Sequence, residues 1–447
     1  MTQQHDSHNP ITSSSKNDIP TNRQLITEGS ISMLYPKDVV FYNPVQVQNR
    51  DLSIIMIQMY AERHYKRMML SIQKKKILKN EREKMKNQKD GGSKKGKKPQ
   101  MDMKEVEEQL SIYEQSVDWK KVILSGKNAC AIDGGSDSSF KGIRILDALA
   151  ASGLRSLRYY KELMPTKLID SITINDLDEA AVDLAKENIE YNDLIHALQD
   201  HRDDNNQSAT TNHNEAHQRE IHLKNEDATH LMYMSRQKTN PYIHAPTTIK
   251  SSTLQDQYDV IDLDPYGTAS PFIDSAIQAV TNGGMLAITC TDMNSLGGSH
   301  PDTCYARYNA MPISKAKYLQ ELALRMLLGN IARRAAVYGR SIKPILSVGM
   351  AFYVRVFVEV WEYGPDVKNL SLRIGNVHQS VQCPSFHVVP HGQQSKHNEH
   401  LIQPTRAPLI PCCSESGGAF KTAGPIWLGP LHDQHVTKEA VERLEDL

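Results

Sequence analysis

The chain has 447 residues, of which 39% are hydrophobic and 23% are charged, and its 52 basic residues balance its 52 acidic residues. This length allows a large core and predicts two domains, whereas no apolar run approaches the ~18 residues of a transmembrane helix, which excludes a membrane-spanning protein. Six scattered cysteines without a preceding secretory signal are typical of reduced thiols in an intracellular protein.

Residues 1–24 are rich in Ser, Asn, Gln and Asp and are predicted to form a disordered tail. A mitochondrial presequence is rich in Arg and poor in acids, and this tail is neither. We therefore expect a protein of the nucleus or cytoplasm, with a mitochondrial form left open.

After short strands and turns, a helix is predicted from Ile54 to Tyr65, with Asn49 or Asp51 as its N-cap. Arg50 then lies near the positive end of the helix dipole, where a cation is mildly unfavourable. Two interpretations of Arg50 stay open at this point: it meets a ligand or an acid, or it is an ordinary surface arginine.

Two segments are predicted to be low-complexity insertions. The first, residues 74–104, belongs to a stretch with sixteen Lys and Arg against four acids between Arg63 and Lys104. Such a segment cannot bury enough apolar surface to become ordered, and we interpret it as a loop insertion that adds nonspecific affinity for RNA; a nuclear-import signal is the alternative. The second, residues 196–220, is a His-rich polar tract that is more typical of disorder than of a metal site.

From Lys141 onward, strand-like and helix-like segments alternate. The predicted strands are 142–147, 171–176, 221–228, 258–263, 285–291 and two within 345–361, and the predicted helices are 154–163, 178–191, 271–282 and 315–337. Strands separated by helix-length segments imply right-handed β-α-β units and a parallel sheet. The sequence therefore predicts a doubly wound, Rossmann-like α/β domain over residues 25–363, followed by a small C-terminal domain over residues 364–447.

Three predicted strand ends carry residues that suit an adenosyl ligand. The turn from Asp147 to Gly153 is not the G-x-G-x-x-G of a dinucleotide site, so no pyrophosphate is expected there. Asp176 suits the ribose hydroxyls, and Asp227 with Ala228 suits adenine. S-adenosylmethionine is such a ligand, and Arg50 or Arg155 suits its zwitterionic methionine end. Acids at strand ends are also common turn residues, so the prediction depends on finding suitable residues at all three strand ends in this order, and no single acid is sufficient.

The fourth strand ends in Asp264-Pro-Tyr-Gly267. This sequence also suits a simple turn, but at a strand end it places a carboxylate, a rigid carbonyl and a ring together. The exocyclic amine of guanine is a poor nucleophile, and acceptors on its hydrogens localise its lone pair. Asp264 and Pro265 are therefore predicted to act in catalysis, with Asp264 as the base, and Tyr266 is predicted to stack on the purine.

Several blocks in this order resemble the tRNA (guanine-26-N2)-dimethyltransferases, a family of class I S-adenosylmethionine-dependent enzymes. The similar blocks are Phe41-Tyr-Asn-Pro-Val-Gln, Asn49-Arg-Asp-Leu-Ser, Leu146-Asp-Ala-Leu-Ala-Ala-Ser-Gly-Leu-Arg-Ser-Leu-Arg158, Asn175-Asp-Leu-Asp, Asp262-Leu-Asp-Pro-Tyr-Gly-Thr, Thr289-Cys-Thr-Asp-Met, Tyr353-Val-Arg-Val-Phe-Val-Glu-Val and Gly424-Pro-Ile-Trp-Leu-Gly-Pro-Leu-His-Asp433.

The resemblance implies methyl transfer from S-adenosylmethionine to N2 of guanine-26 in tRNA, giving N2-methyl- and N2,N2-dimethylguanosine, with no obligate protein partner. It implies that the cofactor is bound by a set of five residues, Arg50, Arg155, Asp176, Asp227 and Ala228. It also implies that Asp264 is the catalytic acid/base and that Phe41 and Tyr266 flank the guanine. The alternatives are an amino methyltransferase that acts on DNA or protein and an RNA-binding protein whose activity has lapsed.

Two departures from the family pattern concern the C-terminal region. The family often carries paired C-x-x-C elements that suggest zinc, but here Ser380 stands three residues before Cys383 and Ser416 three residues after Cys413. A structural zinc site needs four good ligands, so we predict no zinc and no other metal. Family members also usually continue well past the Gly-Pro-Ile-Trp block, so residues 364–447 are expected to form only part of a tRNA-binding domain.

Overall fold

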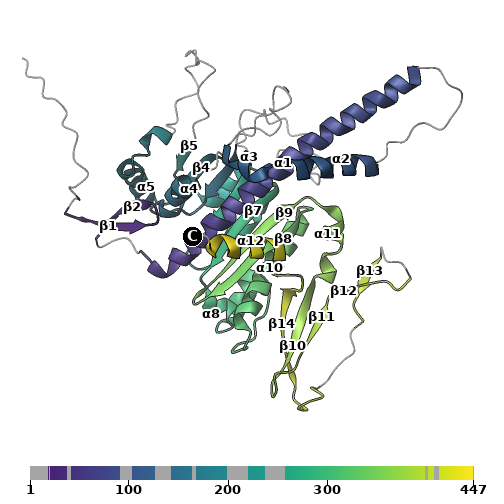
Figure 1. Cartoon of the computed structure of the whole chain (residues 1–447). Helices are drawn as coiled ribbons and strands as arrows, with labels where there is room; N and C mark the ends of the chain where they lie inside the picture. The colour runs from purple at the N-terminus through teal and green to yellow at the C-terminus, as the bar shows by residue number, and fades with distance from the viewer. Residues whose placement is uncertain are drawn as a thin grey trace, which may run out of the picture.

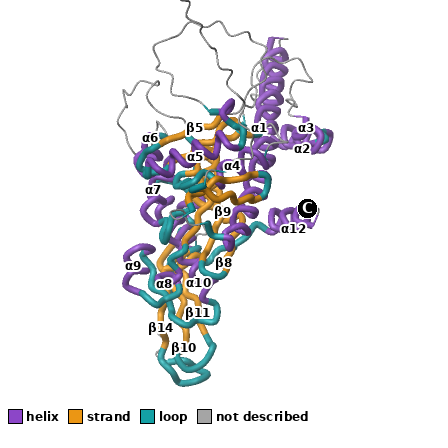
Figure 2. The backbone as a smooth tube through the Cα atoms, turned by 90° about the vertical axis from the view of Figure 1, so that its left-hand side faces the viewer, coloured by secondary structure: helices purple, strands orange, loops and turns teal. Residues whose placement is uncertain are grey.

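The computed structural model describes residues 19, 21–37, 42–90, 103–125, 142–163, 168–198, 220–236, 257–397, 401–406 and 412–445. A seven-stranded sheet with helices on both faces lies at the centre of this described chain (Figure 1, Figure 2). Its strand order is β5-β4-β3-β6-β7-β9-β8. The strands are β3 (Ile143–Asp147), β4 (Ile169–Asn175), β5 (Glu220–Lys224), β6 (Tyr258–Leu263), β7 (Val280–Cys290), β8 (Ser341–Met350) and β9 (Tyr353–Trp361).

The predicted doubly wound fold is confirmed, because β5, β4, β3, β6 and β7 pair in parallel. Helices connect these strands, namely α4 (Leu154–Glu162), α5 (Glu179–Tyr191), α6 (Ala228–Met234) and α7 (Ile273–Ala279), and α10 (Leu319–Val337) follows β7. Within this sheet β9 runs opposite to the other six strands, since it forms an antiparallel hairpin with β8 and also pairs antiparallel with β7. The carboxyl ends of the parallel strands therefore meet at one edge, where ligands bind in open α/β sheets.

The helix predicted over residues 271–282 is shorter than expected. It begins as a 3-10 turn, η4 (Ser270–Phe272), continues as α7 and ends at Ala279. Val280 already belongs to β7, where it pairs with Tyr258, so the helix does not reach residue 282 and Gly283-Gly284 is part of a strand. A Cβ on Gly284 would lie 3.0 Å from the carbonyl oxygen of Asp259, so glycine permits a close approach of β7 to β6 there.

The sheet separates two apolar cores. Val260 of β6 faces the core that contains residues of α1 (Val47–Asp90) and α4, whereas its neighbour Ile261 faces the core built with α7 and α10. Because successive side chains of a strand point to opposite faces, a strand buried on both sides reads as a continuous apolar run. This explains why residues 258–263 are buried throughout.

Helix α1 corrects two predictions. It follows a 3-10 turn, η1 (Pro44–Gln46), whose cap is the Asn43 side chain, which accepts a hydrogen bond from the backbone N–H of Val45. Asn49 and Asp51 therefore lie within the helical segment, so the expectation that one of them caps it was wrong.

The expectation that residues 74–104 remain unordered was also wrong for residues 74–90, which continue α1. The antiparallel neighbour α2 (Met103–Ser116) supplies the packing surface: Val106 is completely buried and Ile77 of α1 is nearly so. An ion pair of 2.7 Å between Lys66 Nζ and Glu114 Oε1 links the two helices before α3 (Trp119–Ser125). Residues 91–102 lie outside the described chain.

The N-terminal hairpin of β1 (Arg23–Glu28) and β2 (Ile31–Pro36) packs on α5. There the Asn188 side chain accepts from the N–H of Leu34 at 2.7 Å and donates to its carbonyl at 3.3 Å. The predicted tail covers residues 1–24, and its last two residues, Arg23 and Gln24, belong to β1. Residues 1–18 of the tail lie outside the described chain. Of the predicted 196–220 insertion, residues 199–219 are also outside it, while His196 lies in η3 (Ile195–Ala197).

The C-terminal region forms a second sheet in the order β11-β10-β14 and returns to the main sheet through α12. Gly329 of α10 allows close packing here, because a Cβ would lie 3.1 Å from the backbone nitrogen of Trp427 in β14. Arg443 of α12 pairs with Glu62 of α1 at 2.6 Å. The remaining elements are α8 (Met293–Leu296), α9 (Pro301–Tyr308), α11 (Gly364–Lys368), η5 (Leu370–Leu372), β10 (Ile374–Ser380), β11 (Phe386–Pro390), β12 (Gly392–Gln394), β13 (Ile402–Pro404), β14 (Phe420–Trp427) and α12 (Gln434–Glu445).

None of the helices within the described ranges is both long enough and apolar enough to cross a bilayer.

Val106→Asp tests whether α2 orders the distal part of α1. A carboxylate at this fully buried position lacks a partner and is expected to cost roughly 3 kcal/mol or more, which detaches α2. Hydrogen exchange should then lose protection in residues 74–90, while the control Glu107→Asp, at an exposed neighbouring position, keeps it. Unchanged protection in Val106→Asp would show that α1 orders without α2.

Candidate active site

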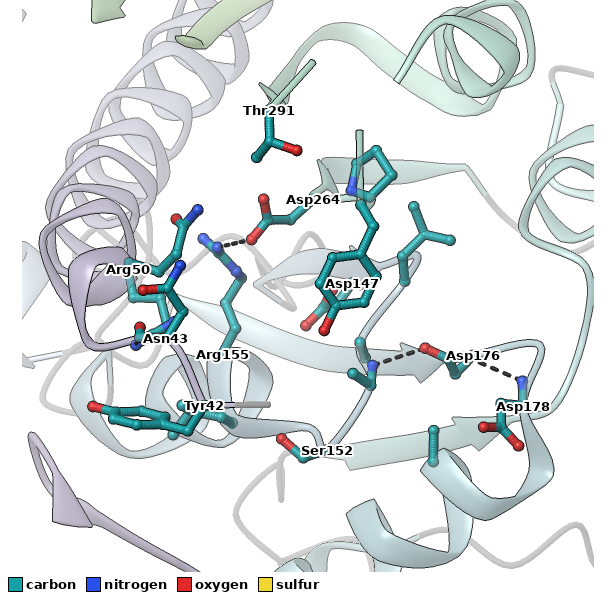
Figure 3. A pocket seen from close by; sticks show the side chains of 18 of the residues that line it. Tyr42, Asn43, Arg50, Asp147, Ser152, Arg155, Asp176, Asp178, Asp264 and Thr291 are labelled. Carbon is teal, nitrogen blue, oxygen red and sulfur yellow. Dashed lines mark hydrogen bonds and ion pairs between the residues drawn. The ribbon is translucent and has the colours of Figure 1, made fainter. Parts of the chain in front are cut away.

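A cavity of about 780 Å³ lies at the carboxyl ends of β3, β4 and β6, next to the start of α1 (Figure 3). It brings together six of the residues predicted from the sequence, which are Arg50, Arg155, Asp176, Asp264, Pro265 and Tyr266. Acidic, basic, apolar and aromatic side chains thus share one space, although they are separated by up to about two hundred residues in the chain.

The Asp264-Pro-Tyr-Gly267 turn is held against the end of β7. The N–H of Gly267 donates to Thr291 Oγ1 at 2.8 Å, and the N–H of Thr291 donates to the Gly267 carbonyl at 2.8 Å. Gly267 adopts φ 85°, a conformation that favours glycine. The turn leaves the Tyr266 ring 87% exposed at the cavity. A large ring in this position is available for stacking rather than used for packing.

Arg155 of α4 holds the Asp264 carboxylate from the protein side. Its Nη2 donates to Asp264 Oδ2, and its Nη1 donates to Ser53 Oγ of α1 at 3.0 Å (Figure 3). Burial acts to lower the pKa of Arg155, but the charges of Asp264 and Asp262 outweigh burial and keep that pKa well above its ordinary value. Asp264 therefore has one oxygen engaged by a permanently charged guanidinium.

Beneath this pair, Asp262 and Arg355 of β9 form a fully buried ion pair. Arg355 donates to both carboxylate oxygens of Asp262, at 2.8 and 3.2 Å, and also to Ser53 Oγ at 2.8 Å. The hydroxyl of Tyr159 donates to the same carboxylate at 2.5 Å. Burial acts to raise the pKa of Asp262, while Arg355 and Arg155 lower it below the ordinary value. Ser53 accepts from both arginines and so connects this layer to Arg155.

Asp147, at the end of β3, is the third carboxylate of this cluster. It lines the cavity, yet only 1% of its surface is exposed, and it accepts a hydrogen bond of 2.7 Å from Ser156. Burial and the nearby charge of Asp262 raise the pKa of Asp147 to about 7, and Arg155 opposes this rise. Sequence reasoning treated Asp147 only as the start of a turn, because its burial depends on α4 and β6.

Asp176 organises the loop that follows β3. Its carboxylate accepts from the N–H of Ala151 at 2.8 Å and from the N–H of Asp178 at 3.0 Å (Figure 3). Ala151 has φ 45° and Gly153 has φ 77°, so the loop bends sharply before α4 begins. Carboxylate oxygens have further lone pairs, so Asp176 retains acceptor capacity toward the cavity.

Arg50 meets an acid, as one of the two interpretations anticipated. Its Nε and Nη2 donate to the two oxygens of Glu28 at 2.6 and 2.5 Å, and Arg158 donates to Glu28 at 2.8 Å. Burial acts to raise the pKa of Glu28, but its hydrogen bonds with Arg50 lower that pKa below the ordinary value. The β1 end of the N-terminal hairpin thereby positions Arg50 at the cavity.

Two predicted residues, Asp227 and Ala228, do not line this cavity, and a third lies outside the described residues. The Asp227 carboxylate caps α6 by accepting from the N–H of His230 at 2.8 Å, and Ala228 is the first residue of that helix. Phe41 lies outside the described residues. Their predicted roles therefore remain predictions.

Besides Asp147, the cavity residues that sequence reasoning did not single out include Tyr35, Tyr42, Thr291 and Phe352. Thr291 stands in the Thr289-Cys-Thr-Asp-Met block, whose position at the end of a predicted strand was an available signal. Phe352 lies in the turn between β8 and β9, and its approach to the cavity follows only from the antiparallel course of β9.

The cavity fits S-adenosylmethionine by its chemistry. It offers the Asp176 carboxylate for a ribose, the apolar wall of Leu149 and Ala150, and arginine donors for a carboxylate. The β3–α4 loop has the αL residues of a sharp turn but no glycine-rich phosphate cradle. An adenosyl ligand without phosphates is consistent with this set.

A family model described as N2,N2-dimethylguanosine tRNA methyltransferase matches residues 21–447. The chain belongs to this family. The family resemblance noted from the sequence motifs is thus confirmed, and so is the methyltransferase class of the sheet.

The chain is similar to several curated family members. A tRNA (guanine(26)-N(2))-dimethyltransferase of Mus musculus is 33% identical over 415 residues, covering 91% of this chain and 52% of that protein. One from Schizosaccharomyces pombe is 32% identical and covers 94% and 65%, and one from Saccharomyces cerevisiae, named as mitochondrial, is 29% identical and covers 93% and 62%. The chain thus spans about half to two-thirds of these relatives' length.

A solved structure supports the fold assignment. Trm1 from Pyrococcus horikoshii, in a complex with S-adenosyl-L-methionine, matches 95% of this chain and 78% of that chain, with a TM-score of 0.57 and 21% sequence identity. At this identity the likeness establishes the common fold.

The raised pKa of Asp147 predicts a pH-dependent stability. Between the unfolded value near 3.9 and the folded value of about 7, the folded state holds a proton that the unfolded state releases, so stability falls as pH rises through this window. At about 1.4 kcal/mol per pKa unit, the total loss approaches roughly 4 kcal/mol.

Asp147→Asn should therefore gain stability relative to the natural chain, and this gain should be larger at about pH 8 than at about pH 4. Denaturant unfolding at both pH values measures it. Asp302→Asn, at an exposed position in α9, is the control and should show no such trend. Parallel curves for Asp147→Asn and the natural chain would contradict a protonated Asp147.

Proposed function

We propose that this chain transfers methyl groups from S-adenosylmethionine to N2 of guanine-26 in tRNA. The observation that carries the proposal is the placement of Asp264 and the exposed Tyr266 ring at the same cavity as Asp176. A guanine acceptor site and an adenosyl site then adjoin. The family membership and the names of the relatives support guanine-26 as the target.

Asp264 suits the chemistry that guanine requires. When bound, S-adenosylmethionine supplies a sulfonium methyl group, and the amine must attack it in line. Asp264 accepts hydrogen bonds from guanine N1–H and N2–H, localises the amine lone pair, and takes the proton that the amine loses. Arg155 occupies the other side of the carboxylate, so the orientation of Asp264 is set before the base arrives. Such preorganisation contributes to rate through positioning.

Pro265 and Tyr266 complete the acceptor site. Pro265 has a fixed φ and presents its carbonyl next to Asp264, while the Tyr266 ring covers the purine face, with Phe41 proposed on the other face. A guanine paired or stacked in tRNA must rotate out to reach this turn, at a cost of roughly a few kcal/mol. Stacking on the exposed ring returns about 1–3 kcal/mol of that cost.

For the cofactor, we assign Asp176 to the ribose and Asp227 with Ala228 to the adenine. Arg50 and Arg155 serve the methionine end, since a guanidinium has five N–H donors and Glu28, Asp264 and Ser53 use only some of them. Arg155 in this way contacts both halves of the site.

The activity is tested with purified chain, S-adenosylmethionine carrying a labelled methyl group, and unmodified tRNA. The expected result is label in N2-methyl- and N2,N2-dimethylguanosine at position 26. A matched tRNA with inosine at position 26, which lacks the exocyclic amine, should stay unlabelled. Tight tRNA binding without label transfer would overturn the proposal and support an RNA-binding protein without activity.

Asp264→Ala should abolish methyl transfer, with a loss of at least about 10²–10⁴-fold, because the amine then lacks its acceptor and base. Cofactor binding, measured by calorimetry, should change little. Asp302→Ala, at an exposed acid in α9, serves as the control for both readings. If Asp264→Ala instead loses cofactor affinity, Asp264 belongs to the cofactor site.

We further propose that α1 contributes to tRNA binding through a basic face, defined as Lys75, Lys79 and Arg82. These three residues are exposed and are spaced by four and three positions, which places them on one side of the helix. Lys84 lies about half a turn away from Lys75 and pairs with Glu81 at 2.7 Å. A basic stripe of this kind suits the phosphates of a folded RNA.

The double variant Lys75→Ala/Lys79→Ala should weaken tRNA binding for all tRNAs alike. Its plot of log affinity against log salt should be shallower by about 1–2 than that of the natural chain, because fewer phosphate counterions are released. Filter binding at several salt concentrations gives this slope, with Lys84→Ala as the control. An unchanged slope would exclude the basic face from the tRNA interface.

A further inference from the structure

Two turns face one another at one end of the three-stranded sheet β11-β10-β14. The first begins at Ser380, the last residue of β10, and contains Cys383, and the second precedes β14 and contains Cys413 and Ser416. The sulfur atoms of Cys383 and Cys413 are 3.5 Å apart, and the hydroxyl oxygens of Ser380 and Ser416 are 3.2 Å apart. Each turn thus supplies one thiol and one hydroxyl to a single cluster.

This cluster does not fit zinc. A structural zinc site uses four Cys or His ligands, and here two of the four positions are serine. His387 does not replace them, because its ring packs edge-on against Phe420 with centroids 5.5 Å apart. Within the described residues, no three His, Cys, Asp or Glu side chains are arranged to hold a metal ion. The cluster therefore places two thiols close together but does not provide a complete set of metal ligands in the described part of the chain.

We propose that Cys383 and Cys413 are an oxidisable dithiol that forms a reversible disulfide when the chain meets a peroxide. A disulfide bond is about 2.05 Å long, so the two sulfur atoms, 3.5 Å apart, need to approach by roughly 1.5 Å to form one. The backbone of the turns is already in place: the N–H of Cys413 donates to the carbonyl of Gly418, and the N–H of Gly417 donates to the carbonyl of Cys413, both at 2.8 Å.

The surroundings also favour reaction at this pair over the buried thiols of Cys290 and Cys304. Hydrogen bonds from Ser380, Ser385 and Ser416 lower the pKa of Cys383 to about 6, and Ser416 lowers that of Cys413. A thiolate is the reactive form of cysteine. By contrast, burial raises the pKa of Cys290 and Cys304 to about 12, and neither has exposed surface.

The oxidation balances in two steps. The Cys383 thiolate attacks one oxygen of hydrogen peroxide, the O–O bond breaks, and hydroxide leaves as Cys383 becomes a sulfenic acid. The Cys413 thiolate then attacks Cys383 Sγ, the S–O bond breaks, and a second hydroxide leaves and is protonated to water. The two thiols lose two electrons in total, which reduce the peroxide. A dithiol reductant reverses the result by exchange.

The cross-link would close the segment between Cys383 and Cys413, which includes β11, β12 and β13. Ser380 pairs with Phe420 in the β10–β14 register, so the bond would pin the open end of that strand pair. A disulfide stabilises the folded state mainly because it reduces the conformational freedom of the unfolded segment that it closes. The oxidised three-stranded sheet should therefore resist proteolysis better than the reduced sheet.

The test treats the full chain with hydrogen peroxide, quenches it, and analyses intact mass and non-reducing peptide maps. The expected product loses the mass of two hydrogen atoms, and one peptide with Cys383 is linked to the peptide that holds Cys412 and Cys413. Since Cys412 is exposed and adjacent, the control Cys412→Ser should still form the link, whereas Cys413→Ser should not. A link that survives Cys413→Ser but is lost in Cys412→Ser would overturn the proposal.

Two further measurements sharpen the result. Ser380→Ala and Ser416→Ala should slow disulfide formation several-fold without abolishing it, because the thiolate loses hydroxyl donors. An unchanged rate would show that these hydroxyls do not activate the thiols. Zinc added to the reduced chain should not protect the thiols, and stoichiometric zinc that blocks oxidation would identify a metal site instead. Neither measurement requires methyl transfer, so a failure of the proposed activity leaves this test intact.

Discussion

The site depends on one buried carboxylate, Asp262, held between two arginines. Arg355 meets it from β9 and Arg155 from α4, and Ser53 of α1 accepts from both guanidinium groups. Removing two charges from water costs several kcal/mol per ion, which is offset only when geometry and hydrogen bonding are good. Here four separate elements, β6, β9, α4 and α1, must assemble correctly before the cluster is satisfied, so the cluster ties the fold to the site above it.

What this cluster provides is a fixed position for Asp264. Arg155 bridges the buried Asp262 and the cavity-facing Asp264, so the carboxylate proposed to act on guanine rests on a layer that solvent does not reach. On the other side, Thr291 at the end of β7 fastens the turn that carries Tyr266. Removing one member of such a buried pair typically costs 3–5 kcal/mol. Rigid support of this kind is what general-base positioning requires.

The sequence predicted the parts of this arrangement that local pattern determines. Continuous apolar runs located β3, β4 and β6, and the residues after them placed Asp176 and Asp264 at one sheet edge. Long-range packing determined the rest. Helix α1 continues past residue 74, where Ile77 is buried and α2 packs on α1, Val280 joins β7 because it pairs with Tyr258, and Phe352 reaches the cavity because β9 runs antiparallel. No local signal in the chain encodes these contacts.

A structure of the chain with S-adenosylhomocysteine and a tRNA that carries guanine-26 tests the central claim most directly. We expect the guanine stacked on Tyr266, with Asp264 within about 3 Å of N1 and N2, Arg155 on the opposite side of that carboxylate, and the ribose of the cofactor at Asp176. A guanine amine that faces another group, or a cofactor whose ribose lies away from Asp176, would contradict this arrangement.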